Sequence, residues 1–353
     1  MKSFLGLIFI CILVSCQKHY NDEYIEIDLN DANESILYSS FVDSVSYLTF
    51  QFGDVPIAGI EKIYKKEDYY YIQGKQSTGI FVFDKFGKMY SHINNFGEGP
   101  EQFRMISSFS VVSTTGDICI LDYASQQTKY YTKEGSFIKS IPCSNWSVDI
   151  ASLSEEQIVF ISPFYITDNE LSGVWLANGQ NHYIKQLRDD VTTDHRFYYY
   201  PMTYTVSDTC LYYYDRNWDY LSRISENGME ITNQFRVKQK LPSSLMGNVQ
   251  TPIPSLNGYA ICDRFLYSSS QTMIVYCLFN YEGNKDMRSY VWALLDNHSH
   301  KLDMARKLYN DLDNVQIENH EYFHLDDLTW SVVCNDNADS FDICLQLLHL
   351  KKL

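Results

Sequence analysis

Residues 79–103 read GIFVFDKFGKMYSHINNFGEGPEQF and contain the smallest unit of the fold. Two runs rich in aromatic and β-branched residues, 80–83 and 88–93, flank the turn Asp84-Lys85-Phe86-Gly87. An aspartate followed three residues later by glycine favours a tight turn, because glycine adopts the positive φ that a side chain resists. The stretch therefore predicts a β-hairpin, followed by a Gly-Glu-Gly-Pro loop at 97–100.

This hairpin belongs to a four-strand unit that the sequence repeats. The first unit has strand-like runs at 59–64, 68–73, 80–83 and 88–93, and the second has them at 106–112, 116–122, 129–132 and 136–141. Weaker cycles span 147–187, 199–237, 259–308 and 322–350. A period of about 40 to 50 residues with four strands per unit is typical of a β-propeller. We expect an all-β, six-bladed β-propeller, with a pair of β-sandwiches as the alternative architecture.

The last cycle shows only three strand-like runs, so the ring needs one more strand. Residues 44–51 alternate in the manner of a strand, with apolar side chains at Val45, Tyr47, Leu48 and Phe50. An open sheet edge exposes unpaired backbone groups, which closure of the ring removes. We therefore expect this N-terminal strand to complete the last blade.

One region departs from the strand pattern. Its apolar residues fall at helical spacing and predict a short amphipathic helix or turn over 301–312. They are Leu302, Ala305, Leu308, Tyr309 and Leu312.

The N-terminal sequence predicts a targeting signal. An apolar run at 4–14 follows Lys2, and it is shorter than the ~20 residues that a membrane-spanning helix needs, so it predicts an export signal. The end of this run, Leu13-Val14-Ser15-Cys16, resembles a bacterial lipobox, in which cleavage precedes the cysteine and the cysteine carries the lipid. An ordinary cleaved signal is the alternative. We expect a signal peptide at 1–15, a lipidated tether and N-terminal segment at 16–40, and a single propeller at 41–353, held by Cys16 to a membrane of the cell envelope.

Composition excludes some functions. The formal net charge of −16 repels a phosphate backbone, so nucleic acid is not an expected partner. Seven cysteines remain beyond Cys16, and their wide spacing without a Cys-x-x-Cys motif indicates neither a zinc knuckle nor a redox motif. Most of them lie in apolar runs and are expected in the core. No nucleophile elbow, Walker loop or dinucleotide fingerprint occurs, so we assign no catalytic residue and no cofactor.

Three motifs suggest metal sites only weakly. His320-Glu321-Tyr322-Phe323-His324 matches His-Glu-x-x-His, but a zinc protease needs a helix there, and the flanking sequence favours strand. The pair His298 and His300 lies in a polar segment that favours an exposed turn. Asp311-x-Asp313 lacks the other oxygen positions of an EF-hand. We assign no metal ligand.

Clusters of aromatic residues are the remaining candidates for a ligand-binding surface. They are Tyr69–Tyr71, residues 197–200, Tyr204, Tyr212–Tyr214, and the tryptophans at 146, 175, 218, 292 and 330. Such rings stack on sugars or peptides, yet neighbouring residues of a strand face opposite sides, so we favour core packing over a binding face for most of them. Separately, Asp43-Ser44-Val45 resembles a short O-glycosylation sequon and marks Ser44 for possible glycan attachment.

The segment Phe96-Gly97-Glu98-Gly99-Pro100-Glu101-Gln102-Phe103 resembles the inter-blade signature of the six-bladed β-propeller lipoproteins of Bacteroides-type bacteria, which are relatives of NHL-repeat and TolB-like propellers. Residues 118–122 with Gly135 are similar to the second blade of that family, and 309–313 resemble its late Asn-Asp-x-Asp signature, although Asn314-Val315 replaces the usual glycine pair. The resemblance implies the fold and an envelope location, and it implies no chemistry.

These observations favour a cell-envelope lipoprotein whose propeller binds a glycan, a peptide or another envelope protein. A hydrolase or lyase with its site in the central channel is the alternative, and a purely structural partner of an envelope protein is a third possibility. An enzyme should show ionisable groups with perturbed pKa values converging at the axis. A binding module should show an aromatic-lined groove, and a structural partner an exposed apolar patch.

Overall fold

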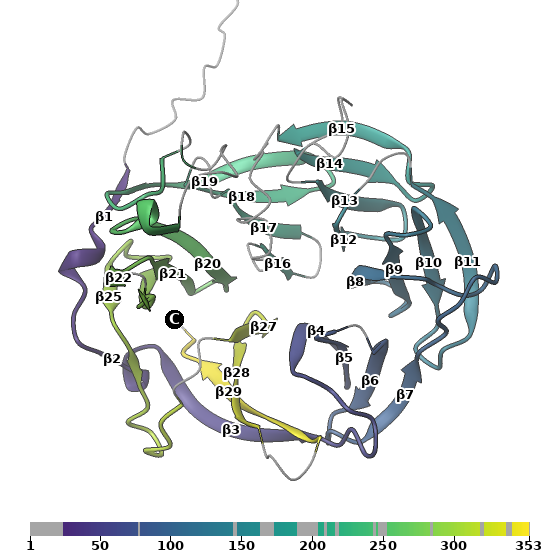
Figure 1. The fold of residues 1–353 in the computed structure, drawn as a ribbon, viewed down its shortest axis with the longest axis horizontal. Coiled ribbons are helices and arrows are strands. Elements are labelled where there is room, and N and C mark those ends of the chain that lie inside the picture. Colours follow the sequence, from purple (N-terminus) through teal and green to yellow (C-terminus); the bar gives the residue numbers. More distant parts are fainter. Residues whose placement is uncertain are drawn as a thin grey trace, which may run out of the picture.

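The structure is a ring of six antiparallel sheets around a central axis (Figure 1). It is a computed structural model, and it describes residues 24–76, 78–143, 147–162, 173–188, 204–207, 210–215, 219–242, 245, 253–282, 285–317, 321–336 and 341–352. The six-bladed β-propeller predicted from the repeats is confirmed.

Each blade contains four strands, which follow one another from the axis outward. Blade one contains β4 (Ile60–Lys66), β5 (Tyr69–Gly74), β6 (Ile80–Asp84) and β7 (Met89–Ile93). Blade two contains β8 (Ile106–Val111), β9 (Ile118–Asp122), β10 (Gln127–Tyr131) and β11 (Phe137–Pro142). Blade three contains β12 (Asp149–Ser152), β13 (Gln157–Ser162), β14 (Gly173–Asn178) and β15 (Tyr183–Arg188).

The second half of the ring follows the same order. Blade four contains β16 (Tyr204–Ser207), β17 (Cys210–Asp215), β18 (Tyr220–Ser225) and β19 (Gly228–Val237). Blade five contains β20 (Ala260–Tyr267), β21 (Gln271–Leu278), β24 (Ser289–Asp296) and β25 (Leu302–Ala305). Blade six contains β27 (Tyr322–Asp326), β28 (Thr329–Asp336), β29 (Ile343–Leu350) and the N-terminal strand β3 (Val42–Phe50).

The predicted closure of the ring is confirmed. β3 pairs antiparallel with β29, from Phe50 opposite Ile343 to Val42 opposite Leu350. The hairpin turn of blade one contacts this closing strand, because Gln51 N donates to the carbonyl of Gly87 at 2.9 Å. Gly87 has φ +77°, and a Cβ at this position would lie 2.0 Å from the Thr49 carbonyl oxygen, so glycine is needed both for the turn and for the approach of the two segments.

Hydrophobic side chains hold neighbouring blades together. Six clusters of buried residues each join two consecutive blades, and one of them joins blade six to blade one. Because side chains alternate along a strand, adjacent residues serve different clusters. Tyr70 packs toward blade six and Tyr71 toward blade two, while Tyr213 packs toward blade three and Tyr214 toward blade five. Burial of each such side chain contributes roughly 1.5–3 kcal/mol, and the full set of clusters keeps the ring closed.

Residues 24–41, which precede β3, lie along the outside of the ring (Figure 1). We call residues 24–41 the N-terminal strap; it contains β1 (Ile25–Ile27), η1 (Leu29–Asp31), β2 (Ile36–Leu37) and η2 (Tyr38–Ser40). β1 adds a parallel fifth strand to β19, and β2 pairs with β26 (Leu308–Tyr309) beyond blade five. Leu29 and Tyr38 are buried against blades four to six, so the strap is part of the packed domain.

The prediction of a short amphipathic helix or turn over 301–312 is wrong. This segment forms β25, which pairs with β24, and β26, which pairs with the strap. Leu302 and Met304 pack against the cluster between blades four and five, whereas Ala305 and Leu308 pack against the next cluster. The apolar residues therefore serve two strands that change partners, and their helical spacing is a coincidence.

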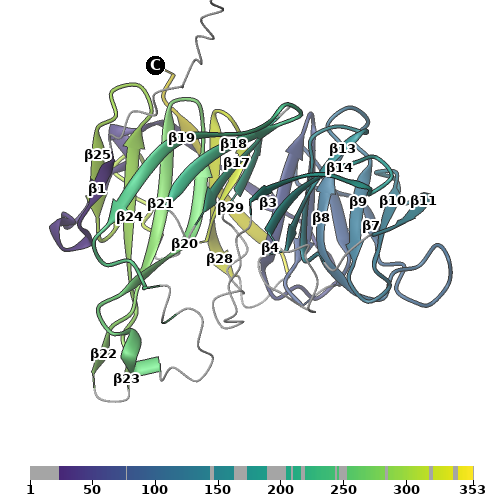
Figure 2. The ribbon, with the colours of Figure 1, turned by 90° about the horizontal axis from the view of Figure 1, so that it is seen from above.

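In side view the two faces of the ring differ (Figure 2). The small hairpin of β22 (Tyr281–Glu282) and β23 (Lys285–Asp286) projects from one face, with η4 (Ile253–Leu256) beside it. The opposite face carries the short turns that follow the inner strands, such as Glu67-Asp68 after β4. Within the described residues, no helix has the length and apolar character needed to cross a membrane.

Candidate ligand-binding site on the propeller axis

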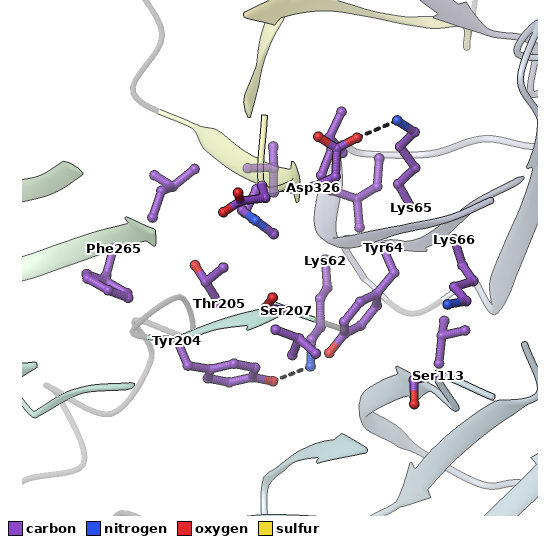
Figure 3. A pocket seen from close by; sticks show the side chains of 18 of the residues that line it. Lys62, Tyr64, Lys65, Lys66, Ser113, Tyr204, Thr205, Ser207, Phe265 and Asp326 are labelled. Carbon is purple, nitrogen blue, oxygen red and sulfur yellow. Dashed lines mark hydrogen bonds and ion pairs between the residues drawn. The ribbon is translucent and has the colours of Figure 1, made fainter. Parts of the chain in front are cut away.

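A cavity of about 150 Å³ lies at the centre of the ring (Figure 3). All six innermost strands, or the turns that follow them, contribute to its wall. The polar lining residues on which the argument depends are Lys62, Tyr64, Lys66, Ser207, His324 and Asp326. A site assembled in this way draws its residues from a long stretch of the chain, from Lys62 to Asp327.

Strand β4 supplies the lysines and the tyrosine of the cavity. Its alternation places Ile63 in the hydrophobic cluster toward blade six, whereas Lys62 and Tyr64 face blade two. Lys65 faces blade six and forms an ion pair with Asp326 of β27. Burial alone would raise the pKa of Asp326, but the hydrogen bond and charge of Lys65, together with hydrogen bonds from Thr329 and the Leu328 amide, lower it.

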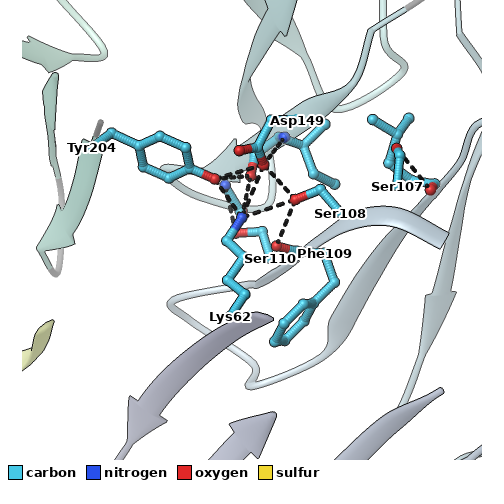
Figure 4. A network of polar contacts seen from close by, with 10 residues as sticks. Lys62, Ser107, Ser108, Phe109, Ser110, Asp149 and Tyr204 are labelled. Carbon is cyan, nitrogen blue, oxygen red and sulfur yellow. Dashed lines mark hydrogen bonds and ion pairs between the residues drawn. The ribbon is translucent and has the colours of Figure 1, made fainter. Parts of the chain in front are cut away.

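The Lys62 ammonium is the centre of a buried polar network (Figure 4). It donates to Ser108 Oγ at 2.9 Å, to Asp149 Oδ1 at 3.0 Å and to the Ile150 carbonyl at 3.3 Å, and it also contacts the hydroxyl of Tyr204. Tyr204 in turn donates to Asp149 Oδ1 at 2.6 Å. These partners lie on β8, β12 and β16, so one ammonium group connects the inner strands of blades one to four.

Electrostatic interactions within this network determine the protonation states of Lys62 and Tyr204. Burial alone would lower the pKa of Lys62, but the neighbouring Asp149 carboxylate and the Tyr64 hydroxyl together more than compensate, and the pKa is raised. Burial, with the charge of Asp149, raises the pKa of Tyr204 well above its ordinary value, so this phenol stays protonated. Lys62 and Asp149 therefore form a hydrogen-bonded ion pair at one end of the cavity, and neither group has the freedom that a nucleophile or general base needs.

Two other polar groups face the cavity without such complete pairing. The hydroxyl of Tyr64 points toward Lys62 in Figure 3, yet this buried atom makes no hydrogen bond of ordinary geometry in the described structure. Its ring packs edge-on against Phe109, with centroids 5.2 Å apart. Burial lowers the pKa of His324 to about 4, so this imidazole is neutral at physiological pH. The wall thus offers an unpaired hydroxyl and a neutral imidazole to a bound polar group.

A second charged cluster lies near the other ends of the inner strands. Glu321, just before β27, contacts the ammonium of Lys75 and lies 3.9 Å from Arg264 Nη2. The guanidinium of Arg264 also lies over the ring of Phe323, 5.4 Å from its centroid. Burial raises the pKa of Glu61 in the same region, against the opposing effect of Lys75 and Arg264.

The structure describes one of the two histidines of the His-Glu-x-x-His motif. His324 lies on strand β27 and lines the axial cavity, whereas His320 lies outside the described residues. The strand expected from the flanking sequence is confirmed, so this motif is not on the helix that a zinc protease requires. His298 and His300 are exposed in the turn after β24, as expected, where Asp296 accepts from the His298 backbone amide.

The two aspartates of the late signature have structural partners. Asp311 accepts from the Ser39 backbone amide at 2.9 Å and from its hydroxyl, and Asp313 accepts from the hydroxyl of Tyr47 at 2.6 Å. These bonds attach the loop after β26 to the strap and to the closing strand. The signature thereby has a role in ring closure.

Core packing is confirmed for most described members of the aromatic clusters. Tyr70, Tyr71, Tyr204, Tyr213, Tyr214 and Trp330 are buried, whereas Tyr69, Tyr212, Trp175 and Trp292 are partly buried. Residues 197–200 and the tryptophans at 146 and 218 lie outside the described residues. Of these aromatics, Tyr204 also lines the axial cavity, which is a small pocket of mixed polar and apolar lining and differs from the aromatic-lined groove expected of a binding module.

Of the predicted modification sites, Ser44 is described and lies away from the axis. Ser44 is exposed on β3, the outermost strand of blade six. Cys16 lies outside the described residues. Among the described cysteines, Cys119, Cys210, Cys262 and Cys277 are buried, as expected.

Sequence comparison places the chain in a family. The family described as "Domain of unknown function (DUF4934)" matches residues 24–339. The chain belongs to this DUF4934 family. The match begins at the strap and covers all strands from β1 to β28, in agreement with a single packed unit that includes the strap. No curated protein matches the chain.

Solved structures share the fold of this DUF4934 chain. A "Putative exported protein" from Bacteroides fragilis NCTC 9343 has 16% sequence identity and a TM-score of 0.70, over 94% of this chain and 100% of that chain. A member of the DUF4221 family from Bacteroides vulgatus ATCC 8482 has 11% identity and a TM-score of 0.60, over 89% and 98% of the two chains. These likenesses support the propeller fold and agree with the resemblance to Bacteroides propellers seen in the sequence.

Proposed function

We propose that this DUF4934 protein is an exported, lipid-anchored binding protein of the cell envelope, and that its axial cavity takes a small polar group. The observation that carries the proposal is the buried hydroxyl of Tyr64, which lies beside Lys62 but makes no hydrogen bond of ordinary geometry, in the wall of a cavity assembled from all six blades. A buried polar atom without a partner is costly, and a ligand with a hydroxyl or carboxylate group would satisfy it.

The size of the cavity limits the ligand. Pockets for drug-sized molecules occupy roughly 300–1,000 Å³, whereas a cavity of about 150 Å³ holds a group the size of benzene. The site therefore suits a small molecule, part of one sugar unit of a glycan or one side chain of a peptide. Lys66, also in the wall, has no carboxylate partner among the described residues and would favour an anionic or hydroxylated group.

A thermal-shift screen of residues 17–353 tests this function. Glycans, peptides and small carboxylates are compared with divalent metals, each with and without a chelator, because a ligand that binds only the folded state raises its apparent Tm. A Ser207→Phe variant, which places a ring in the cavity, should lose the shift, and an exposed Ser40→Phe variant should keep it. Equal shifts in both variants, or no shift with any ligand, would contradict the axial site.

The lipid anchor is proposed from Leu13-Val14-Ser15-Cys16. A Cys16→Ala variant should lose incorporation of a labelled fatty acid and leave the membrane fraction, whereas Cys11→Ala, inside the apolar run, should behave as the natural protein does. Fatty-acid labelling that survives Cys16→Ala would contradict this assignment.

Glycan attachment is proposed at Ser44, which the structure leaves accessible. The intact mass of protein purified from its own envelope should exceed the polypeptide mass, and Ser44→Ala should remove the excess. Ser46→Ala is the matched control, because Ser46 lies on the same strand but bonds to His349 Nε2 at 2.8 Å. An unmodified intact mass would refute the assignment.

The second candidate function is a hydrolase or lyase acting in the channel. It is favoured by one observation, the convergence of Glu61, Lys75, Arg264 and Glu321 with the pKa of Glu61 raised by burial. Structural ion-pair networks also perturb pKa values, so this observation carries less weight than the cavity. If the channel is catalytic, a ligand found in the screen should be converted by the protein, and Glu61→Gln should abolish conversion while binding persists.

A further inference from the structure

Two cysteines of blade six lie side by side on neighbouring strands. Cys334 belongs to β28 and Cys344 to β29, and the register between these strands shifts there. Leu345 lies opposite Val333 and Cys344 lies opposite Asn335, so Cys334 is the additional residue of a β-bulge. If the register of residues 329–333 continued without the bulge, Cys334 would lie directly opposite Cys344 on the same face of the sheet, and with the bulge the two side chains are still neighbours.

The two sulfur atoms are already in contact. Cys334 Sγ lies 3.5 Å from Cys344 Sγ and 3.3 Å from the Cys344 carbonyl oxygen. A disulfide bond is about 2.05 Å long, so small side-chain rotations must shorten the separation by about 1.5 Å. Both residues are partly exposed, which gives an oxidant access. Four of the other described cysteines are buried, and the fifth, Cys143, contacts the amide of Asn181 at 3.7 Å.

We propose that Cys334 and Cys344 form a disulfide bond in the exported protein. The proposal rests on the proposed export, because disulfides form and persist in oxidising compartments outside the cytoplasm. One thiol loses its proton and attacks the disulfide of a protein or small-molecule oxidant, forming a mixed disulfide and releasing one thiolate of the oxidant. The second cysteine, as thiolate, attacks its neighbour in the mixed disulfide and releases the other thiolate, so the oxidant gains the two electrons that the cysteines lose.

This bond would stabilise the blade on which ring closure depends. It would link β28 to β29, and β29 is the strand that pairs with the N-terminal strand β3. The closed loop contains residues 334–344, and a cross-link of this kind restricts the unfolded chain. The oxidised protein should therefore have a higher Tm than the reduced protein.

Peptide mapping tests the proposal. The full chain is produced with its own signal in a host that exports it, and free thiols are blocked under denaturing conditions. Cleavage at aspartate separates the two cysteines, because Asp336, Asp339 and Asp342 lie between them. Two linked peptides that separate on reduction are expected, and Cys334→Ala and Cys344→Ala should each abolish the link and the Tm difference. Cys143→Ala is the control and should keep both.

A second arm separates this inference from the proposed export. Residues 17–353 are purified in reduced form from a cytoplasm and then exposed to oxidised glutathione. Formation of the 334–344 link in this arm, with free thiols in the first, would support the geometry and contradict export to an oxidising compartment. Free thiols at both positions in both arms, or linkage to other cysteines, would overturn the disulfide.

Discussion

Replacing Lys62 by methionine removes the charge that connects four blades and keeps most of the apolar stem. In this variant the Asp149 carboxylate would retain the hydroxyls of Ser108 and Tyr204 and the backbone amide of Ile150, 2.8 Å away. It would lose its only opposite charge among the described residues, since Lys62 is the partner with which Asp149 forms an ion pair. A buried carboxylate without its counter-charge destabilises a protein by about 3–5 kcal/mol.

This loss is large relative to the whole stability of a folded protein, which is about 5–15 kcal/mol. Urea unfolding of residues 17–353, followed by tryptophan fluorescence, should show a lower midpoint at an unchanged m-value. The double variant Lys62→Met/Asp149→Leu should recover much of the loss, because replacing a complete buried ion pair with apolar side chains is often neutral. Lys65→Met is the control, since its pair with Asp326 is partly exposed and should contribute about 1 kcal/mol or less.

The reasoning about the network would be refuted by either of two results. Lys62→Met could destabilise the protein no more than Lys65→Met does, which would mean that solvent reaches the pair. The double variant could also lose the sum of the two single effects, which would mean that Lys62 and Asp149 are not energetically coupled.

Three further predictions concern His324, the strap and the closing turn. The pKa of His324 is about 4 in the folded protein and 6.5 in the unfolded chain, so the unfolded chain binds more protons between these pH values. The free energy of unfolding should therefore fall by up to about 3 kcal/mol as the pH drops from 6.5 to 4. His324→Gln should remove this part of the acid sensitivity, and an unchanged pH profile would contradict the burial of His324. Leu29→Ala should lower the free energy of unfolding by about 2–4 kcal/mol, because Leu29 is fully buried, and an effect below about 0.5 kcal/mol would mean that the strap is not packed. Gly87→Ala should cost more than Gly53→Ala, since both have positive φ but a Cβ meets the Thr49 carbonyl only at residue 87; equal midpoints in urea would contradict this close contact.

Much of the fold could be predicted because it depends on local sequence. Turns such as Asp84–Gly87 recur between runs of strand-forming residues, and the repeat period determines the architecture. The closing strand could be predicted because the last cycle of the sequence has three strand-like runs where a blade needs four. Residues 44–51 could supply the fourth strand. Strand β12 could not be recognised from the sequence, because it has only four residues, Asp149–Ser152. Three of them are buried, so the strand lacks the alternation of buried and exposed residues that marks a half-buried strand.

The axial site could not be predicted, for physical reasons. Lys62 contacts partners 46, 87 and 142 residues away, and each partner comes from a different blade. No local spacing in the sequence could therefore predict that these residues meet. The one available signal was a lysine between apolar residues in Ile60–Tyr64, where a buried charge requires a partner. The helix predicted over 301–312 failed because periodicity cannot show that the two short strands pair with different partners.

The measurement that tests the central claim most directly is the affinity of the strongest ligand for the Tyr64→Phe variant. The account predicts unchanged or slightly higher stability, because the lost hydroxyl is buried and unpaired, together with about tenfold weaker binding, equivalent to about 1.4 kcal/mol. Tyr90→Phe, which removes an exposed hydroxyl on β7, should leave the affinity unchanged. Equal affinities of the natural protein and both variants would contradict ligand binding in the axial cavity.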